Sequence, residues 1–150
     1  MKRFSMGLLV AGLGLVGSHA TAQDLDKAVK ARQAVMQLYA FNLGTLGAMA
    51  KGQMDYDAAV AQAAAGNIVK VSSQNQMAYW PQGSAVGEVE GSKALPAVWE
   101  NMEDVGAKAA ALTEAAMQAE AATDLAGLQA AMGAMGGACG ACHKSYRQSD

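Results

Sequence analysis

Two cysteines and a histidine near the end of the chain have a spacing that suits covalent attachment of a flat cofactor. Cys139, Cys142 and His143 form the pattern C-x-x-C-H, which is the attachment signature of a c-type haem. Residues three or four positions apart share one face of a helix, so both thiols can form thioethers with the two vinyl groups of one porphyrin. His143 stays on that face, and its imidazole can reach the iron from the proximal side.

A C-x-x-C pair also has other uses. A structural zinc site needs about four Cys or His ligands, whereas the whole chain has two cysteines and two histidines. A thioredoxin-like dithiol lies early in a βαβ pattern, and no strand pattern lies near this motif. A disulfide within the motif would close a very short loop and would stabilise little. Haem attachment is the interpretation we favour, and the disulfide remains the alternative.

The first 22 residues are typical of an export signal. Lys2 and Arg3 precede an apolar run over residues 6–16, and the small-x-small triplet at 20–22 follows it. The run is shorter than the about 20 residues that a membrane-spanning helix needs. We therefore expect cleavage after Ala22 and a periplasmic mature protein of residues 23–150, which forms one domain without a membrane span. Covalent haem attachment agrees with export, because c-type haem is usually attached outside the cytoplasmic membrane.

Cleavage changes both the ligands and the charge of the chain. It removes His19, so His143 is the only histidine of the mature chain, and ligation by two histidines is excluded. Loss of Lys2 and Arg3, with no acid before Asp24, shifts the formal net charge from −2 to −4. There is no basic stripe, so nucleic acid is not an expected partner. An acidic surface favours short encounters with basic or neutral redox partner proteins.

Apolar periodicity predicts four helices, over residues 25–50, 55–76, 95–122 and 124–146. The expected N-caps of the first, second and fourth are Asp24, Asp55 and either Thr123 or Asp124. Residues 79–92 are rich in glycine and form the one long irregular stretch, and such a loop usually crosses the structure or covers a site. Two short connections and one long one predict an all-α fold, an antiparallel four-helix bundle.

The last predicted helix contains five glycines, at positions 127, 133, 136, 137 and 140. Each costs about 1 kcal/mol in a helix interior, so this density needs a reason. Small residues would let a macrocycle lie close to the helix backbone. Close packing of another helix is the alternative.

Four segments, in order along the chain, resemble the cytochrome c′ family and its low-spin, methionine-ligated relatives. The haem motif continues to Tyr146-Arg147, similar to the family's C-x-x-C-H-x-x-[YF]-R ending. Residues 31–36 (ARQAVM) resemble its R-Q-x-x-[LM] segment, residues 50–52 and 56–59 its first turn and second helix, and residues 96–99 (PAVW) its P-x-[IV]-W segment. The resemblance covers the whole mature chain and implies a four-helix bundle with one covalently bound haem c.

The resemblance also implies roles for three residues outside the motif. Arg147 would lie near the proximal imidazole, disfavour its protonation and raise the reduction potential. Arg32 lies on the apolar seam of the first helix, where a charge needs a partner, and the haem propionates would supply one. Trp80 would pack on the haem edge. The plainer alternatives are a solvated arginine, a side chain that extends to solvent and an aromatic that fills the core.

Met36 matches the distal [LM] position of the family and lies one helical turn after Arg32. Its thioether is the best available ligand on the face opposite His143, and such ligation gives a low-spin electron carrier. If Met36 only lines the pocket, the iron has five ligands and binds NO or CO, as in cytochrome c′ itself. A methionine that merely fills a core gap is the third interpretation.

Electron transfer is the function that we favour. The mature chain offers no nucleophile–base pair and its single histidine is assigned to iron, so we do not expect an enzyme. Gas binding is the alternative, and a protein that only stores haem is less favoured. Members of the family often form homodimers through the first two helices, and the sequence does not decide whether this chain does.

Overall fold

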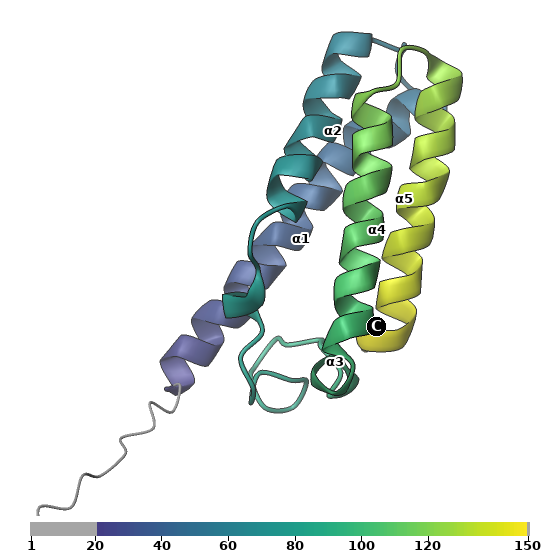
Figure 1. Cartoon of the computed structure of the whole chain (residues 1–150). Coiled ribbons are helices and arrows are strands. Elements are labelled where there is room, and N and C mark those ends of the chain that lie inside the picture. The colour runs from purple at the N-terminus through teal and green to yellow at the C-terminus, as the bar shows by residue number, and fades with distance from the viewer. Residues whose placement is uncertain (1–20, 150) are drawn as a thin grey trace, which may run out of the picture.

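A computed structural model describes residues 21–149 and shows four long helices arranged as an antiparallel bundle (Figure 1). They are α1 (Ala22–Ala50), α2 (Ala58–Ser72), α4 (Met102–Glu120) and α5 (Leu125–Tyr146). A 3-10 helix, η1 (Met77–Tyr79), and the one-turn helix α3 (Ala97–Glu100) lie in the long connection between α2 and α4. The predicted all-α bundle is confirmed. Most of the predicted signal segment, residues 1–20, lies outside the described residues.

Two of the predicted helix starts are wrong. The hydroxyl of Thr21 accepts the backbone N–H of Asp24, so the cap of α1 is Thr21 and Asp24 lies in the first turn. The carboxylate of Asp57 accepts the backbone N–H of Val60 at 3.0 Å, so α2 starts two residues later than the expected cap at Asp55. In both cases the true cap has an extended backbone, which directs the side chain at the N–H three residues on. The start of α5 is confirmed, with Asp124 as its cap.

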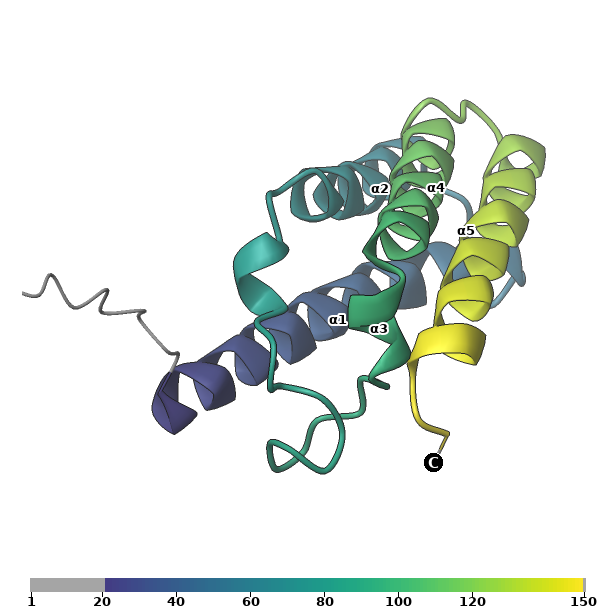
Figure 2. The ribbon, with the colours of Figure 1, turned by 60° about the horizontal axis from the view of Figure 1, so that its bottom comes forward.

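The third predicted helix is broken in two. The backbone leaves the helical region at Asn101, with φ −135° and ψ 43°, and the Asn101 side chain donates to the carbonyl of Ala97 at 3.1 Å. An asparagine that bonds to nearby backbone competes with helix formation, which apolar periodicity does not reveal. The break sets α3 at an angle below α4, where it joins the long loop (Figure 2).

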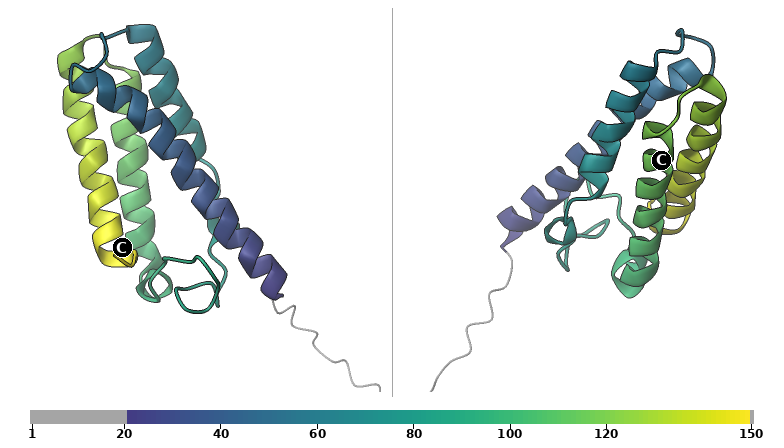
Figure 3. Two further views of the ribbon diagram at one scale, coloured as in Figure 1. Left: turned by 180° about the vertical axis from the view of Figure 1, so that it is seen from behind. Right: turned by 45° about the horizontal axis from the view of Figure 1, so that its top comes forward.

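The two ends of the bundle are packed differently. The closed end, beside the α1–α2 and α4–α5 turns, holds the fully buried Leu46, Met49 and Leu128, with alanines from α2 and α4 between the helices. Each such large side chain contributes about 1.5–3 kcal/mol when buried. Towards its N-terminal end α1 leans away from α4 and α5 (Figures 1 and 3). We call that end of the bundle the open end.

Candidate haem site

The cysteines and histidine of the motif lie in the last two turns of α5, at the open end. Cys139 and Cys142 are half-buried free thiols, and burial raises the pKa of both. The imidazole of His143 is exposed. Within residues 21–149 no group of three or more His, Cys, Asp or Glu side chains is placed to hold a metal ion.

Glycines leave the helix surface beside His143 open. At 100° per residue, Gly133, Gly136 and Gly140 lie around the helix from His143 on the same side. A Cβ added to any of the three would meet nothing within 4 Å outside its own helix segment. Close packing of another helix therefore does not require these glycines. The open surface fits a flat macrocycle attached to the two thiols and ligated by the imidazole.

The register between the antiparallel helices α1 and α5 shows which residues face this surface. Three neighbouring pairs, taken from the closed end, mark it: Ala50 with Gln129, Gly47 with Met132, and Tyr39 with Cys139. The third pair follows from packing, because Tyr39 belongs to the buried cluster against which Cys139 packs. One turn further along both helices, Met36 is level with Cys142 and His143.

Met36 also lies on the correct side of α1. It precedes Gly47 by eleven residues, which is three helical turns, so both belong to the face that meets α5. Its side chain is nevertheless 41% exposed and is not part of the buried core. The core-filling interpretation therefore loses support. A thioether in this place can either coordinate a haem iron or cover it.

Arg32 is buried, 5% exposed, and all of its acceptors within the described residues are neutral. One terminal nitrogen donates to the carbonyl of Tyr79 at 3.2 Å and to the Ser84 hydroxyl at 2.8 Å. The other donates to the Ser84 carbonyl and, at 2.8 Å, to the Ser92 hydroxyl. Burial lowers the pKa of Arg32. The solvent-facing interpretation is wrong, and an anionic group at this end would offset the cost of burying the cation.

Trp80 joins the loop to the haem-bearing end of α5. Its ring lies 4.8 Å from the Arg32 guanidinium carbon and 6.5 Å from the Trp99 ring, edge to face. The indole N–H of Trp99 donates to the Trp80 carbonyl at 2.9 Å. Cys142 packs against the same cluster. Trp80 and Cys142 thus both pack against the buried residues Ala94, Val98 and Tyr146.

Arg147 ends α5 one turn after His143, and its backbone N–H donates to the His143 carbonyl at 3.1 Å. Partial burial lowers the pKa of His143, and the charge of Arg147 lowers it further. A lowered pKa keeps the imidazole neutral, which is the form that binds iron. The direction of this shift agrees with the role that the resemblance implied for Arg147, and that role stays a prediction.

Sequence reasoning missed two sets of partners at this end. Ser84 and Ser92, the acceptors of Arg32, were not singled out, although a seam arginine opposite a loop with small hydroxyl residues was a usable signal. Tyr146 donates to the carboxylate of Asp104, to which Lys108 donates at 2.7 Å. The bond to Asp104 is the largest cause that raises the pKa of Tyr146 to about 12.

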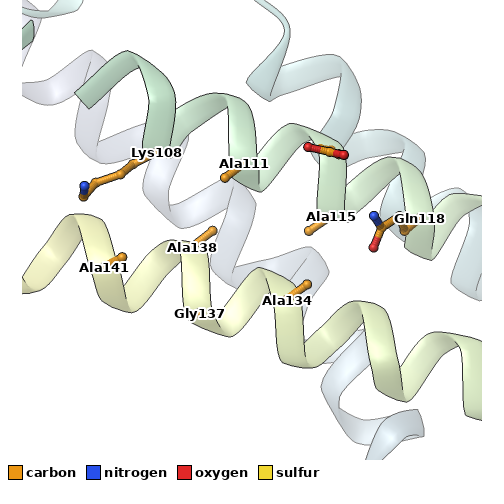
Figure 4. Close-up of a pocket in the computed structure, with 9 residues that line it drawn as sticks. Lys108, Ala111, Ala115, Gln118, Ala134, Gly137, Ala138 and Ala141 are labelled. Atoms are coloured by element: carbon orange, nitrogen blue, oxygen red, sulfur yellow. The ribbon is translucent and has the colours of Figure 1, made fainter. Parts of the chain in front are cut away.

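A groove of about 450 Å³ lies between α4 and α5 (Figure 4). By their spacing at 100° per residue, the α5 residues that line it lie on the side of the helix away from His143. Alanines and Gly137 line most of it, with Lys108, Glu114 and Gln118 from α4. It contains none of the predicted site residues, and we assign it no part in haem binding.

A four-helix bundle whose last helix carries two thiols, an exposed imidazole and an open glycine face defines the bundle class of c-type cytochromes. The chain belongs to the cytochrome c′ family, because the family model described as Cytochrome C' matches residues 27–147. The family binds covalently attached haem c, which is therefore the cofactor of this chain.

Comparison with individual proteins gives the same result. The chain is 47% identical to cytochrome c-554 of Cereibacter sphaeroides over 147 residues, which are 95% of this chain and 96% of that protein. It is 35% identical to cytochrome c' of the same organism, over 98% of both chains. A solved cytochrome c' from Rhodobacter Spheriodes matches with a TM-score of 0.81 at 34% identity, covering 84% of this chain and 98% of that one.

Proposed function

We propose that this chain is an exported electron-transfer cytochrome. Cys139 and Cys142 hold the haem c through thioethers, and His143 and Met36 are its axial ligands. The carrying observation is the place of Met36, exposed on the α5-facing side of α1 and level with His143. The higher identity to cytochrome c-554 than to cytochrome c' of the same organism supports an electron carrier.

Each of the other site residues has a role in this proposal. The bound haem supplies one-electron redox chemistry. Arg147 keeps His143 neutral for ligation, as the lowered pKa of the imidazole indicates. Arg32 offers a buried positive charge for the propionates, and Trp80 covers the haem edge near Cys142.

The test is the absorption spectrum of the purified protein and of Met36→Leu in both oxidation states. We expect a low-spin wild type with the long-wavelength sulfur-to-iron band of ferric methionine-ligated haem. Met36→Leu should lose that band, whereas Met117→Leu should keep it, because Met117 is also an exposed methionine but lies on α4. A wild type that is high-spin in both states would contradict ligation by Met36.

Gas binding is the second candidate function. A nitric oxide complex is known for a variant of cytochrome c prime from Alcaligenes xylosoxidans, which matches this chain with a TM-score of 0.73 at 32% identity. The position of Met36 on the α5-facing side of α1 is compatible with gas binding too, because a thioether can cover the distal face without ligating iron. A high-spin wild type that binds CO without displacing a ligand would favour it.

Location and assembly complete the proposal. We propose that the signal is cleaved after Ala22 and that the mature chain works in the periplasm. Helix α5 is long and apolar enough to span a membrane, with a mean hydropathy of 1.2, but its composition also follows from its place in the bundle and its open haem face.

Another cytochrome c' in the structural comparison is described with ligand-controlled dimer dissociation. We propose that this chain also forms a homodimer, through α1 and α2.

A further inference from the structure

We propose that Arg32, Ser84 and Ser92 form a clamp that holds α1 at a fixed distance from α5 at the open end. Through α1 the clamp positions Met36 on the distal face of the haem. This inference rests on the proposed ligation by Met36. The three residues are positioning residues, since none of them needs to touch the iron.

The first half of the clamp fastens the loop to α1. The Arg32 guanidinium makes two bonds to Ser84 and one to Ser92. The two serines are also joined, because the Ser92 hydroxyl donates to the Ser84 carbonyl at 2.8 Å. Gln33, the next residue after Arg32, adds a second link to the loop. Its side-chain amide donates to the Gly91 carbonyl at 2.9 Å.

The second half fastens the same loop to the end of α5. The backbone N–H of Leu95 donates to the Tyr146 carbonyl at 2.9 Å, and that of Gln148 donates to the Lys93 carbonyl at 2.8 Å. These bonds surround the antiparallel bridge between Ala94 and Arg147. Ser92 is thus one residue away from a segment that is bonded to the haem-bearing helix.

The position of the clamp explains why it matters for Met36. At the closed end the Gln129 side chain donates to the Ala50 carbonyl and Met132 approaches Gly47, and the neighbouring pair Tyr39 and Cys139 lies nearer the open end. At the open end α1 leans away from α5 (Figure 3). The loop bridges the two helices there, one helical turn from Met36. Loosening it would let the N-terminal half of α1 move and carry the thioether with it.

The serine hydroxyls can be removed while the charge of Arg32 is kept. We would compare the holoprotein with Ser84→Ala/Ser92→Ala, with Arg32→Lys, and with Ser73→Ala as control, an exposed serine at the end of α2. Lysine keeps the charge for the propionates but lacks the planar fork that reaches both serines. Two readouts are measured: the rate of CO binding to the ferrous protein, and amide hydrogen exchange of residues 25–36.

The clamp predicts that the double serine variant binds CO about tenfold faster than wild type. Amide hydrogen exchange of residues 25–36 should also be about tenfold faster, while that of residues 125–135 is unchanged. Arg32→Lys should behave like the double variant, and Ser73→Ala like wild type. In a Met36→Leu background the serine changes should still speed exchange but should no longer alter the CO rate.

Three outcomes separate the possible failures. Unchanged exchange of residues 25–36 in both variants overturns the clamp. Arg32→Lys that matches wild type in both readouts also overturns it, because charge alone would then suffice. A five-coordinate wild type overturns the ligation by Met36 and with it the positioning of a ligand, while the exchange rates still show whether the loop holds α1. If the double variant does not retain haem, the same two readouts are taken from Arg32→Lys and the single variant Ser92→Ala, and the same outcomes apply.

Discussion

Arg32 brings a positive charge into a part of the chain where its neighbours are hydroxyls, carbonyls and two indole rings. Neutral neighbours screen the charge of Arg32 only weakly, so it would repel the extra positive charge of an oxidised haem even at a distance. It should therefore favour the reduced state of the iron.

Replacing Arg32 by leucine should lower the reduction potential, by an amount on the order of 1 kcal/mol at the effective dielectric of a partly buried site. Protein-film or spectroelectrochemical titration measures it. Arg32→Lys is the matched comparison, because lysine keeps the charge and loosens the loop as leucine does, so the difference in potential between the two variants reports the charge alone. An unchanged potential in a folded Arg32→Leu variant would remove Arg32 from the electrostatics of the haem.

The two cysteines can be tested separately by mass. Cys139→Ala and Cys142→Ala should each retain haem through one thioether, and the double variant should lose it on denaturation. Mass spectrometry of the denatured chains reads the covalent adduct directly. Haem still bound covalently to the double variant would refute attachment at these thiols.

At this scale the sequence was informative where a residue's type alone carries the chemistry. The thiols, the imidazole and the seam arginine were found from motif and periodicity. Ser84 and Ser92 lie 52 and 60 residues after Arg32. Their meeting depends on a loop that turns at Gly83, Gly87 and Gly91, each with φ near +80°, and no periodic pattern predicts such a path.

The starts of the helices can be tested with a matched pair of aspartates. Asp57→Ala should destabilise the protein by about 1 kcal/mol, because it removes the side-chain cap of α2. Asp55→Ala, the cap that the sequence predicted, should have almost no effect. Denaturant unfolding of the two variants measures the difference. Equal destabilisation would show that α2 starts earlier than in the structure.

The hydrogen bond from Tyr146 on α5 to the Asp104 carboxylate on α4 should make the stability of the protein depend on pH. Hydrogen bonds from Lys108 and then Tyr146 hold the pKa of Asp104 below its ordinary 3.8. A carboxylate whose pKa is lower in the folded chain than in the unfolded chain stabilises the fold at pH values above its unfolded pKa. That stabilisation is lost as the pH falls through the folded pKa. Wild type should therefore lose thermal stability between pH 5 and about pH 3 more steeply than Asp104→Asn. Glu103→Gln, an exposed neighbour, should follow the wild-type curve.

The existence of the helices was predictable and their ends were not. Periodicity found the four long helices because each buries an apolar stripe. The caps at Thr21 and Asp57 and the break at Asn101 depend on the backbone angles of single residues. Several nearby polar residues could have supplied the same bonds.

A homodimer would use an apolar surface on α1 and α2. Phe41 is 76% exposed, Leu38 50% and Val60 43%. They flank the line where α1 meets α2, which the bond from Asn67 to Asn42 marks. We expect Phe41→Asp to shift sedimentation equilibrium to the monomer, and Met117→Asp on α4 to leave it unchanged. A wild type that is monomeric at all concentrations would contradict the dimer.

The bundle as a whole was predictable because four amphipathic segments with short turns have few ways to pack. Its asymmetry was not. At the closed end the bundle buries Leu46, Met49 and Leu128 between its long helices, whereas at the open end the loop spans the space between α1 and α5. Both are properties of contacts between segments far apart in the sequence.

The place of His143 in the last turn of α5 has an electrical consequence. The peptide units of a helix add up to a permanent dipole, equivalent to about half a negative charge at its C-terminal end. The imidazole lies at that end, whereas Met36 is in the middle of α1, where such a dipole has little effect. If His143 and Met36 hold the iron as proposed, it would meet a negative potential on the imidazole side, which the cations at Lys144 and Arg147 would moderate. The balance between the dipole of α5 and the charges of these two side chains would then help to set how readily the iron gives up an electron.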